Sequence, residues 1–118
     1  CILPEQEEVK GLGGTMRLGG YDVIIKTGTQ ARELYGKDSV RERFRHRYNV
    51  NTKCIEMLES AGLVFSGTAP EKRIMQILEL PPGKHPFFFA TQYHPEFTSR
   101  PLAPSPVFMG FLNACAGR

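Results

Sequence analysis

The chain has 118 residues, the length of a single domain, and its 41% hydrophobic and 23% charged residues are typical of a soluble globular protein. No apolar stretch approaches the roughly 20 residues of a membrane-spanning helix, and the acidic first ten residues do not form a secretory signal. The net charge of +3 is too small to indicate nucleic-acid binding, and three widely spaced cysteines indicate neither a disulfide framework nor a zinc site. We therefore expect a cytoplasmic protein that binds neither nucleic acid nor membrane.

Two short elements and one alternating segment are expected in the first fifty residues. Residues 21–26 (YDVIIK) predict a strand. Thr29 is a suitable N-cap for a helix over residues 30–35, which Gly36 would end. Residues 41–50 alternate strictly in character and predict a further extended segment.

The middle of the chain predicts one helix followed by a hairpin. Asn51 would cap a helix over residues 52–61, and Gly62 would end it. Residues 63–68 and 74–80 predict two strands, and the five residues between them favour a hairpin. The buried stripe of the helix would consist of Ile55, Leu58 and Ala61.

The last third predicts a buried strand and a final helix. Residues 87–93 (FFFATQY) are apolar on both faces over most of their length, which suits a central strand covered by helices on each side. Ser105 as N-cap and Pro106 as the first helical residue predict the start of the helix. Its apolar face would carry Val107, Phe108, Phe111, Leu112 and Cys115. Helices interleaved with strands indicate an α/β layered fold.

The candidate catalytic residues follow directly after the predicted central strand. His94 would stand at the carboxyl end of the most buried strand, where open α/β sheets place their sites. Pro95 pushes His94 into extended backbone, in which His94 and Glu96 project to the same side. The Glu96 carboxylate could then hold one imidazole nitrogen and leave the other to serve a nucleophile. A surface histidine and glutamate beside a loop proline is the alternative that so short a motif leaves open.

Arginines alternate along residues 41–50. If this segment is a strand, four guanidinium groups share one face and three aromatic rings share the opposite, more buried face. Because a guanidinium binds carboxylate or phosphate with two hydrogen bonds, an anionic small molecule is a plausible ligand. A solvated edge strand protected by charge is the alternative, and a nucleic-acid contact is a weaker one. The arginines are Arg41, Arg43, Arg45 and Arg47, and the rings are those of Phe44, His46 and Tyr48.

The glycine-rich segment and the cysteines predict less. Residues 11–19 (GLGGTMRLG) match neither a dinucleotide fingerprint nor a P-loop, although Thr15 and Arg17 could form an anion pocket beside flexible backbone. Cys1 would be a nucleophile only at a processed N-terminus, whereas Cys54 and Cys115 are expected to be packed, inert thiols. The three histidines lack metal-ligand spacing, so no metal site is expected.

Three stretches in this order resemble one known family. The runs GGTMRLG, ERFRHRYNVN and QYHPEFTSRPLAPSP resemble the later half of the glutaminase domain of cytidine triphosphate synthases, a member of the class I (triad) glutamine amidotransferases. The resemblance covers residues 12–116. It implies a three-layer class I glutaminase-type α/β fold with a central mixed sheet, of which residues 1–118 would be only the C-terminal part.

The resemblance also implies roles for individual residues. His94 matches the catalytic histidine, Glu96 the carboxylate that orients it, and Arg47 the residue that binds the α-carboxylate of L-glutamine. Thr15 and Arg17 match a segment tied to activation by GTP. In the implied reaction a cysteine thiolate attacks the glutamine amide, and the ammonia released passes to a synthase domain that aminates UTP to CTP using ATP and Mg²⁺.

The resemblance places the nucleophile outside this chain. In the family, the nucleophilic cysteine, the oxyanion-hole glycines and the synthase domain precede the segment matched here. We therefore expect part of a longer, homo-oligomeric (tetrameric) enzyme that binds no cofactor within this segment and is inactive without its upstream half. The first residue, Cys1 and not Met, agrees with this expectation. A non-catalytic glutaminase-like regulatory or assembly module is the alternative.

Overall fold

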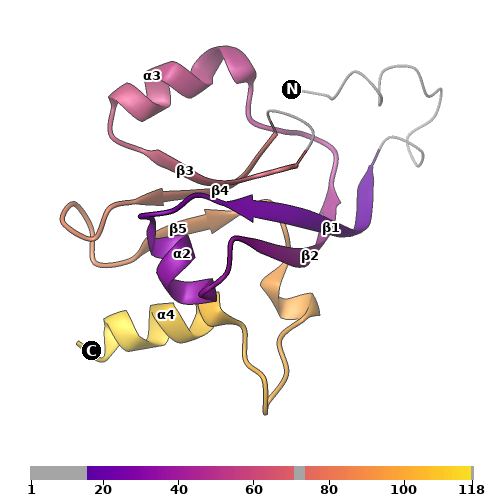
Figure 1. Cartoon of the computed structure of the whole chain (residues 1–118), viewed down its shortest axis with the longest axis vertical. Helices are drawn as coiled ribbons and strands as arrows, with labels where there is room; N and C mark the ends of the chain where they lie inside the picture. The colour runs from indigo at the N-terminus through magenta and orange to yellow at the C-terminus, as the bar shows by residue number, and fades with distance from the viewer. Residues whose placement is uncertain (1–15, 71–73, 118) are drawn as a thin grey trace.

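A curled antiparallel sheet with helices on both faces forms the body of the computed structural model, which describes residues 16–70 and 74–117 (Figure 1). Within these residues the strand order is β2-β1-β3-β4-β5, and each neighbouring pair is antiparallel. The strands are β1 (Arg17–Ile25), β2 (Ser39–His46), β3 (Val64–Thr68), β4 (Met75–Leu80) and β5 (Phe88–Thr91). The helices are α2 (Gln30–Tyr35), α3 (Ile55–Ser60) and α4 (Pro106–Cys115), and two 3₁₀ turns are η1 (Thr52–Cys54) and η2 (Pro95–Phe97).

Two apolar clusters bind the helices to the two faces of the sheet. On one face, Ile55 of α3 packs against Phe65 and Met75. On the other face, which α2 and α4 cover in Figure 1, Ala31 of α2 belongs to the main core cluster. The buried members of that cluster are Val23, Ile25, Ala31, Phe44, Ile77 and Tyr93. The α/β layered architecture expected from the sequence is therefore confirmed.

Local signals predicted the early elements and the hairpin well. The Thr29 hydroxyl accepts a hydrogen bond from the Arg32 N–H, and Gly36 ends α2 with a φ of 63°, as the capping residues indicated. β3 and β4 pair antiparallel and form the expected hairpin. β1 begins at Arg17, four residues before the predicted strand, because it continues along β2 to the Arg17–His46 pair.

Two expectations for the helices were wrong in detail. The helix predicted over residues 52–61 is divided into η1 and α3, and Ala61 is exposed at the end of α3 instead of buried. Asn51 does cap this element, since its side chain accepts from the Lys53 N–H. Ser105 precedes α4 but its side chain makes no capping hydrogen bond, so Pro106 is the start signal that the structure uses.

The strand expected over residues 87–93 is shorter than predicted and lies at an edge. β5 pairs with β4 at the end of the sheet, and no other described strand lies beside it. Phe87 and Phe89 stack on each other, and Phe87 meets Phe111 of α4, whereas Phe88 is exposed. The prediction of a central strand buried on both faces was therefore wrong for the described chain.

A buried carboxylate joins α2 to the sheet. Glu79 of β4 is only 2% exposed, and its two oxygens accept hydrogen bonds from the backbone N–H groups of Gln30 and Ala31 at 2.7 and 3.0 Å. These N–H groups belong to the first turn of α2 and have no acceptor within the helix. Glu79 therefore fixes the start of α2 over the sheet.

Candidate active site

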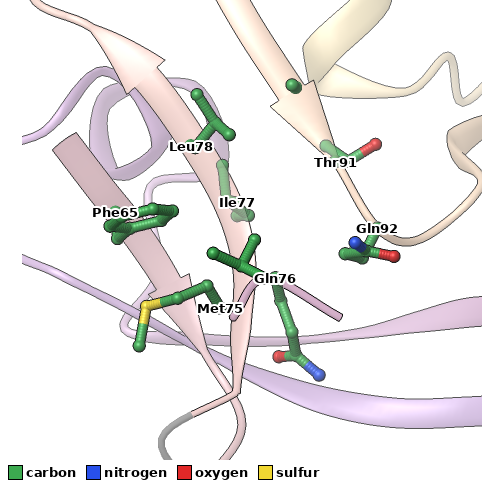
Figure 2. A pocket seen from close by; sticks show the side chains of 9 residues that line it. Phe65, Met75, Gln76, Ile77, Leu78, Thr91 and Gln92 are labelled. Carbon is green, nitrogen blue, oxygen red and sulfur yellow. The ribbon is translucent and has the colours of Figure 1, made fainter. Parts of the chain in front are cut away.

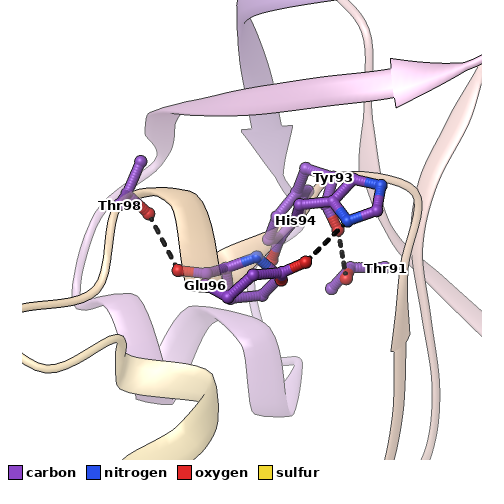
Figure 3. Close-up of polar contacts among 6 residues, drawn as sticks. Thr91, Tyr93, His94, Glu96 and Thr98 are labelled. Carbon is purple, nitrogen blue, oxygen red and sulfur yellow. Dashed lines mark hydrogen bonds and ion pairs between the residues drawn. The ribbon is translucent and has the colours of Figure 1, made fainter.

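A histidine and a glutamate contact each other on the turn that follows β5. The Nδ1 atom of His94 lies 2.8 Å from Oε1 of Glu96, and the two side chains are 37% and 55% exposed (Figure 3). The imidazole also stacks on the Phe97 ring, with a centroid separation of 5.0 Å and an interplanar angle of 20°. The ring is thus oriented on one edge by a carboxylate and on one face by an aromatic ring.

This contact determines which imidazole nitrogen is basic. Because a carboxylate only accepts hydrogen bonds, Nδ1 carries the ring proton and donates a hydrogen bond to Glu96. The lone pair of the neutral ring is then on Nε2. The hydrogen bond from His94 lowers the pKa of the Glu96 carboxyl, so that Glu96 is charged at neutral pH. An imidazole in this tautomer, beside a fixed negative charge, can take a proton at Nε2 and be stabilised as the imidazolium.

Backbone contacts place this turn against β2. The His94 N–H donates to the Arg43 carbonyl at 2.9 Å, and Phe44 and Tyr93 form an antiparallel bridge. His94 has the extended backbone predicted from Pro95, with φ −111° and ψ 94°. Glu96 instead lies in the 3₁₀ turn η2, so the predicted contact is confirmed but a turn, not an extended chain, produces it.

The alternation predicted along residues 41–50 is confirmed only as far as β2 extends. Along β2 the arginine positions 41, 43 and 45 are exposed, whereas Glu42 and Phe44 are buried. Because the strand ends at His46 and the chain then bends, Arg47 lies beyond the strand and is half-buried. The Tyr48 ring is 65% exposed, so its predicted place on the buried face was wrong.

A basic pocket adjoins the histidine. Its volume is about 550 Å³, and its lining residues include Arg43, Arg45 and Arg100 together with Phe97. Phe97 is the ring on which His94 stacks, so the pocket and the histidine share a wall. Three arginines among the lining residues of one pocket favour an anionic ligand.

Arg17 at the start of β1 and His46 at the end of β2 lie opposite each other in the sheet. The Arg17 guanidinium lies 4.1 Å from the centroid of the Tyr21 ring and 5.5 Å from that of Phe44. The His46 Nδ1 atom lies 3.0 Å from the Tyr48 carbonyl oxygen, and burial lowers the pKa of this histidine. Thr15, the other residue expected to take part in GTP activation, lies outside the described residues, as does Cys1.

Sequence reasoning missed the polar groups behind the turn. Glu42 of β2 is buried, and its carboxylate accepts hydrogen bonds from the hydroxyls of Tyr35 and Thr98. The available signal was a charged residue on the inward face of an alternating strand, since such a residue needs polar partners in the core.

Other features of the described residues lie apart from this turn. A smaller pocket of about 80 Å³ opens where β4 meets β5, and its lining, shown in Figure 2, contains no charged side chain.

Cys115 is exposed and Cys54 is half-buried, so the prediction of two packed thiols was wrong for Cys115. Within residues 16–70 and 74–117, no cluster of histidine, cysteine or acidic residues could hold a metal ion. No described helix is long and apolar enough to span a membrane.

Comparison with known proteins identifies the family. The model of the class-I glutamine amidotransferase family matches residues 3–114. The chain is 60% identical over 115 residues to the CTP synthase of Methanosphaerula palustris, a match that covers 98% of this chain and 21% of that protein. It is 57% identical over 118 residues to the CTP synthase of Thermococcus gammatolerans, covering 99% of this chain and 22% of that protein. The chain thus spans about a fifth of the length of these relatives.

A solved structure supports the same assignment at the level of the fold. The glutaminase domain of Trypanosoma brucei CTPS, determined with bound acivicin, superposes with a TM-score of 0.81 at 37% identity. The match covers 87% of this chain and 40% of that one, so the described sheet and helices correspond to part of a class I glutaminase fold. The chain therefore belongs to the class-I glutamine amidotransferase family and corresponds to part of the glutaminase domain of CTP synthases.

Proposed function

We propose that this chain supplies the general base and the substrate clamp of a glutaminase that hydrolyses L-glutamine. The single observation that carries the proposal is the 2.8 Å contact between His94 Nδ1 and Glu96 Oε1, which leaves Nε2 as the basic nitrogen of a partly exposed ring. The resemblance to CTP synthases supplies the reaction to which such a base belongs. His94 and Glu96 are then the catalytic residues of this segment.

The nucleophile in this proposal is a cysteine outside the present chain. His94 Nε2 takes the thiol proton as the thiolate attacks the amide carbon, and it returns the proton to the leaving nitrogen, so that ammonia and a thioester form. In the second step Nε2 takes a proton from water as the water attacks the thioester carbon. The C–S bond then breaks, glutamate leaves, and the imidazolium returns the proton to the cysteine thiolate. Glu96 stabilises the imidazolium in both steps.

Arg47 is the proposed clamp for the α-carboxylate of glutamine. It lies at the bend directly after β2, and the Arg43 carbonyl of that strand accepts the hydrogen bond from the His94 N–H. A planar guanidinium can bind a carboxylate with two parallel hydrogen bonds, which fixes both the position and the direction of the substrate. The clamp and the base would thus be positioned by one strand.

The ammonia product would be used by a synthase domain outside this chain, which aminates UTP to CTP with ATP and Mg²⁺. In this proposal the ATP and Mg²⁺ sites belong to the synthase domain. Activation by GTP at Thr15 and Arg17, and assembly into a homo-tetramer, are further parts of the proposal and rest on the resemblance alone.

A chimeric enzyme tests the proposal directly. In the CTP synthase of Methanosphaerula palustris, the 115 matched residues are replaced by the corresponding residues of this chain. We expect CTP formation with glutamine and also with an ammonium salt, which needs no glutaminase. A chimera that uses ammonium but not glutamine would overturn the proposal and favour the alternative of a non-catalytic regulatory or assembly module.

A further inference from the structure

A single buried carboxylate is joined to both ends of the turn that carries His94 and Glu96. Glu42 of β2 is 6% exposed, and its Oε2 atom accepts a hydrogen bond from the Thr98 hydroxyl at 3.0 Å. The Thr98 hydroxyl also lies 3.3 Å from the Pro95 carbonyl oxygen, a longer separation than the one to Glu42. Thr98 is the C-cap of η2, so this bond fixes the end of the turn.

The other oxygen of Glu42 reaches the start of the turn through two tyrosines. The Tyr35 hydroxyl donates to Oε1 of Glu42 at 3.0 Å, which leaves the Tyr35 oxygen as an acceptor. The Tyr93 hydroxyl lies 2.9 Å from that oxygen and therefore donates to it. Burial raises the pKa of both phenols, so both remain protonated donors. Tyr93 immediately precedes His94, and Thr98 follows Glu96 by two residues.

Stability alone gives little reason for a carboxylate at this place. Burial raises the pKa of Glu42, which means that the protein interior disfavours its charged form. A well-packed apolar side chain is often as stable as a buried charge at such a position. The half-exposed His94 ring, by contrast, needs a well-defined position, because its basic Nε2 atom must lie within hydrogen-bond reach of the reacting groups.

We propose that Glu42 is a positioning residue that fixes the His94–Glu96 turn against β2. Glu42 does not touch substrate; it acts on the turn through the hydroxyls of Thr98 and Tyr93, the latter by way of Tyr35. Since β2 leads on to Arg47, the same strand fixes the distance between the proposed base and the proposed substrate clamp. This inference rests on the proposed glutaminase function.

The test removes one hydroxyl at the exposed end of the network. In the chimeric CTP synthase described above, Thr98→Val keeps the shape of the side chain and loses the bond to Glu42. We expect kcat for glutamine hydrolysis to fall about tenfold, with KM for glutamine within about twofold of the parent, because the base is displaced and the clamp is not. Thr98→Ser restores the hydroxyl and should restore most of the kcat.

Two controls separate positioning from a general loss of structure. Thr27→Val changes an exposed threonine in the turn before α2 and should leave kcat and KM unchanged. CTP formation from ammonium salt should be equal in all variants, since it does not use the glutaminase. Tyr35→Phe, which removes the bond to Oε1 from the other side, should lower kcat in the same way as Thr98→Val.

Three results would overturn the inference. They are an unchanged kcat in Thr98→Val, a rise in KM without a fall in kcat, and a fall in kcat that Thr98→Ser does not restore. A parent chimera that forms CTP from ammonium but not from glutamine would instead contradict the proposed function itself, so the two failures are distinguishable.

Discussion

The carboxylate at the start of α2 allows a quantitative prediction for Glu79→Gln. Its two oxygens accept from the N–H groups of Gln30 and Ala31, at 2.7 and 3.0 Å. A glutamine side chain offers one oxygen and one NH₂ group, so at least one of these N–H groups loses its acceptor. An unsatisfied buried donor costs about 1–3 kcal/mol, and the surviving bond loses about 1 kcal/mol when its acceptor is no longer charged. We therefore expect the start of α2 to open more easily by about 2–4 kcal/mol.

Hydrogen exchange measures this opening without requiring that the whole protein unfold. Because each 1.4 kcal/mol is a factor of ten, the amides of Gln30 and Ala31 should exchange roughly 30- to 700-fold faster in the variant chimera. Glu59→Gln, at an exposed position of α3, is the matched control and should leave the exchange of these amides unchanged. If Glu79→Gln and Glu59→Gln give the same exchange rates, Glu79 does not anchor α2 and the reasoning is refuted.

Three further predictions concern the clamp, the hairpin and the response to pH. Arg47→Ala should raise KM for glutamine about 10- to 100-fold with kcat largely retained, as measured by steady-state glutaminase kinetics; a fall in kcat alone would contradict its role as a clamp. A Cβ atom at Gly67 would lie 2.5 Å from Cγ1 of Ile77, so Gly67→Ala should destabilise the β3–β4 hairpin by about 1–3 kcal/mol, whereas Gly83→Ala, where nothing lies within 4 Å, should not lower the melting temperature. Burial lowers the pKa of His46, so its stabilising contribution is present above its ordinary pKa of 6.5 and is lost as the pH falls through its lower folded value. His46→Gln should therefore reduce the drop in melting temperature on acidification, and an unchanged pH profile would contradict this.

Short-range signals in the sequence predicted those elements whose ends are determined locally. The cap at Thr29 and the left-handed Gly36 set the limits of α2 almost independently of the rest of the fold. The alternation of exposed and buried residues along β2 could be predicted because its inward side chains pack in the core on one face of the sheet. The edge position of β5 could not be predicted, because three adjacent phenylalanines give the same sequence pattern whether neighbouring strands or a helix cover them.

The candidate site divides in the same way. The contact between His94 and Glu96 spans two residues, so the sequence could predict it, although Glu96 lies in the turn η2 and not in the extended backbone that the prediction assumed. The bond between Thr98 and Glu42 spans 56 residues, and it depends on how η2 comes to lie against β2, which no local pattern specifies. A charged residue on an inward-facing strand position shows only that some partner must exist.

The most direct test of the account is the effect of His94→Ala on the two nitrogen sources of the chimeric CTP synthase. We predict that CTP formation from glutamine falls by about 10³-fold or more, since a general base of a triad is lost, while CTP formation from ammonium salt stays at the level of the parent chimera. If the His94→Ala chimera still used glutamine at the parent rate, His94 would not be the base, and the assignment of this turn as the active site would be contradicted.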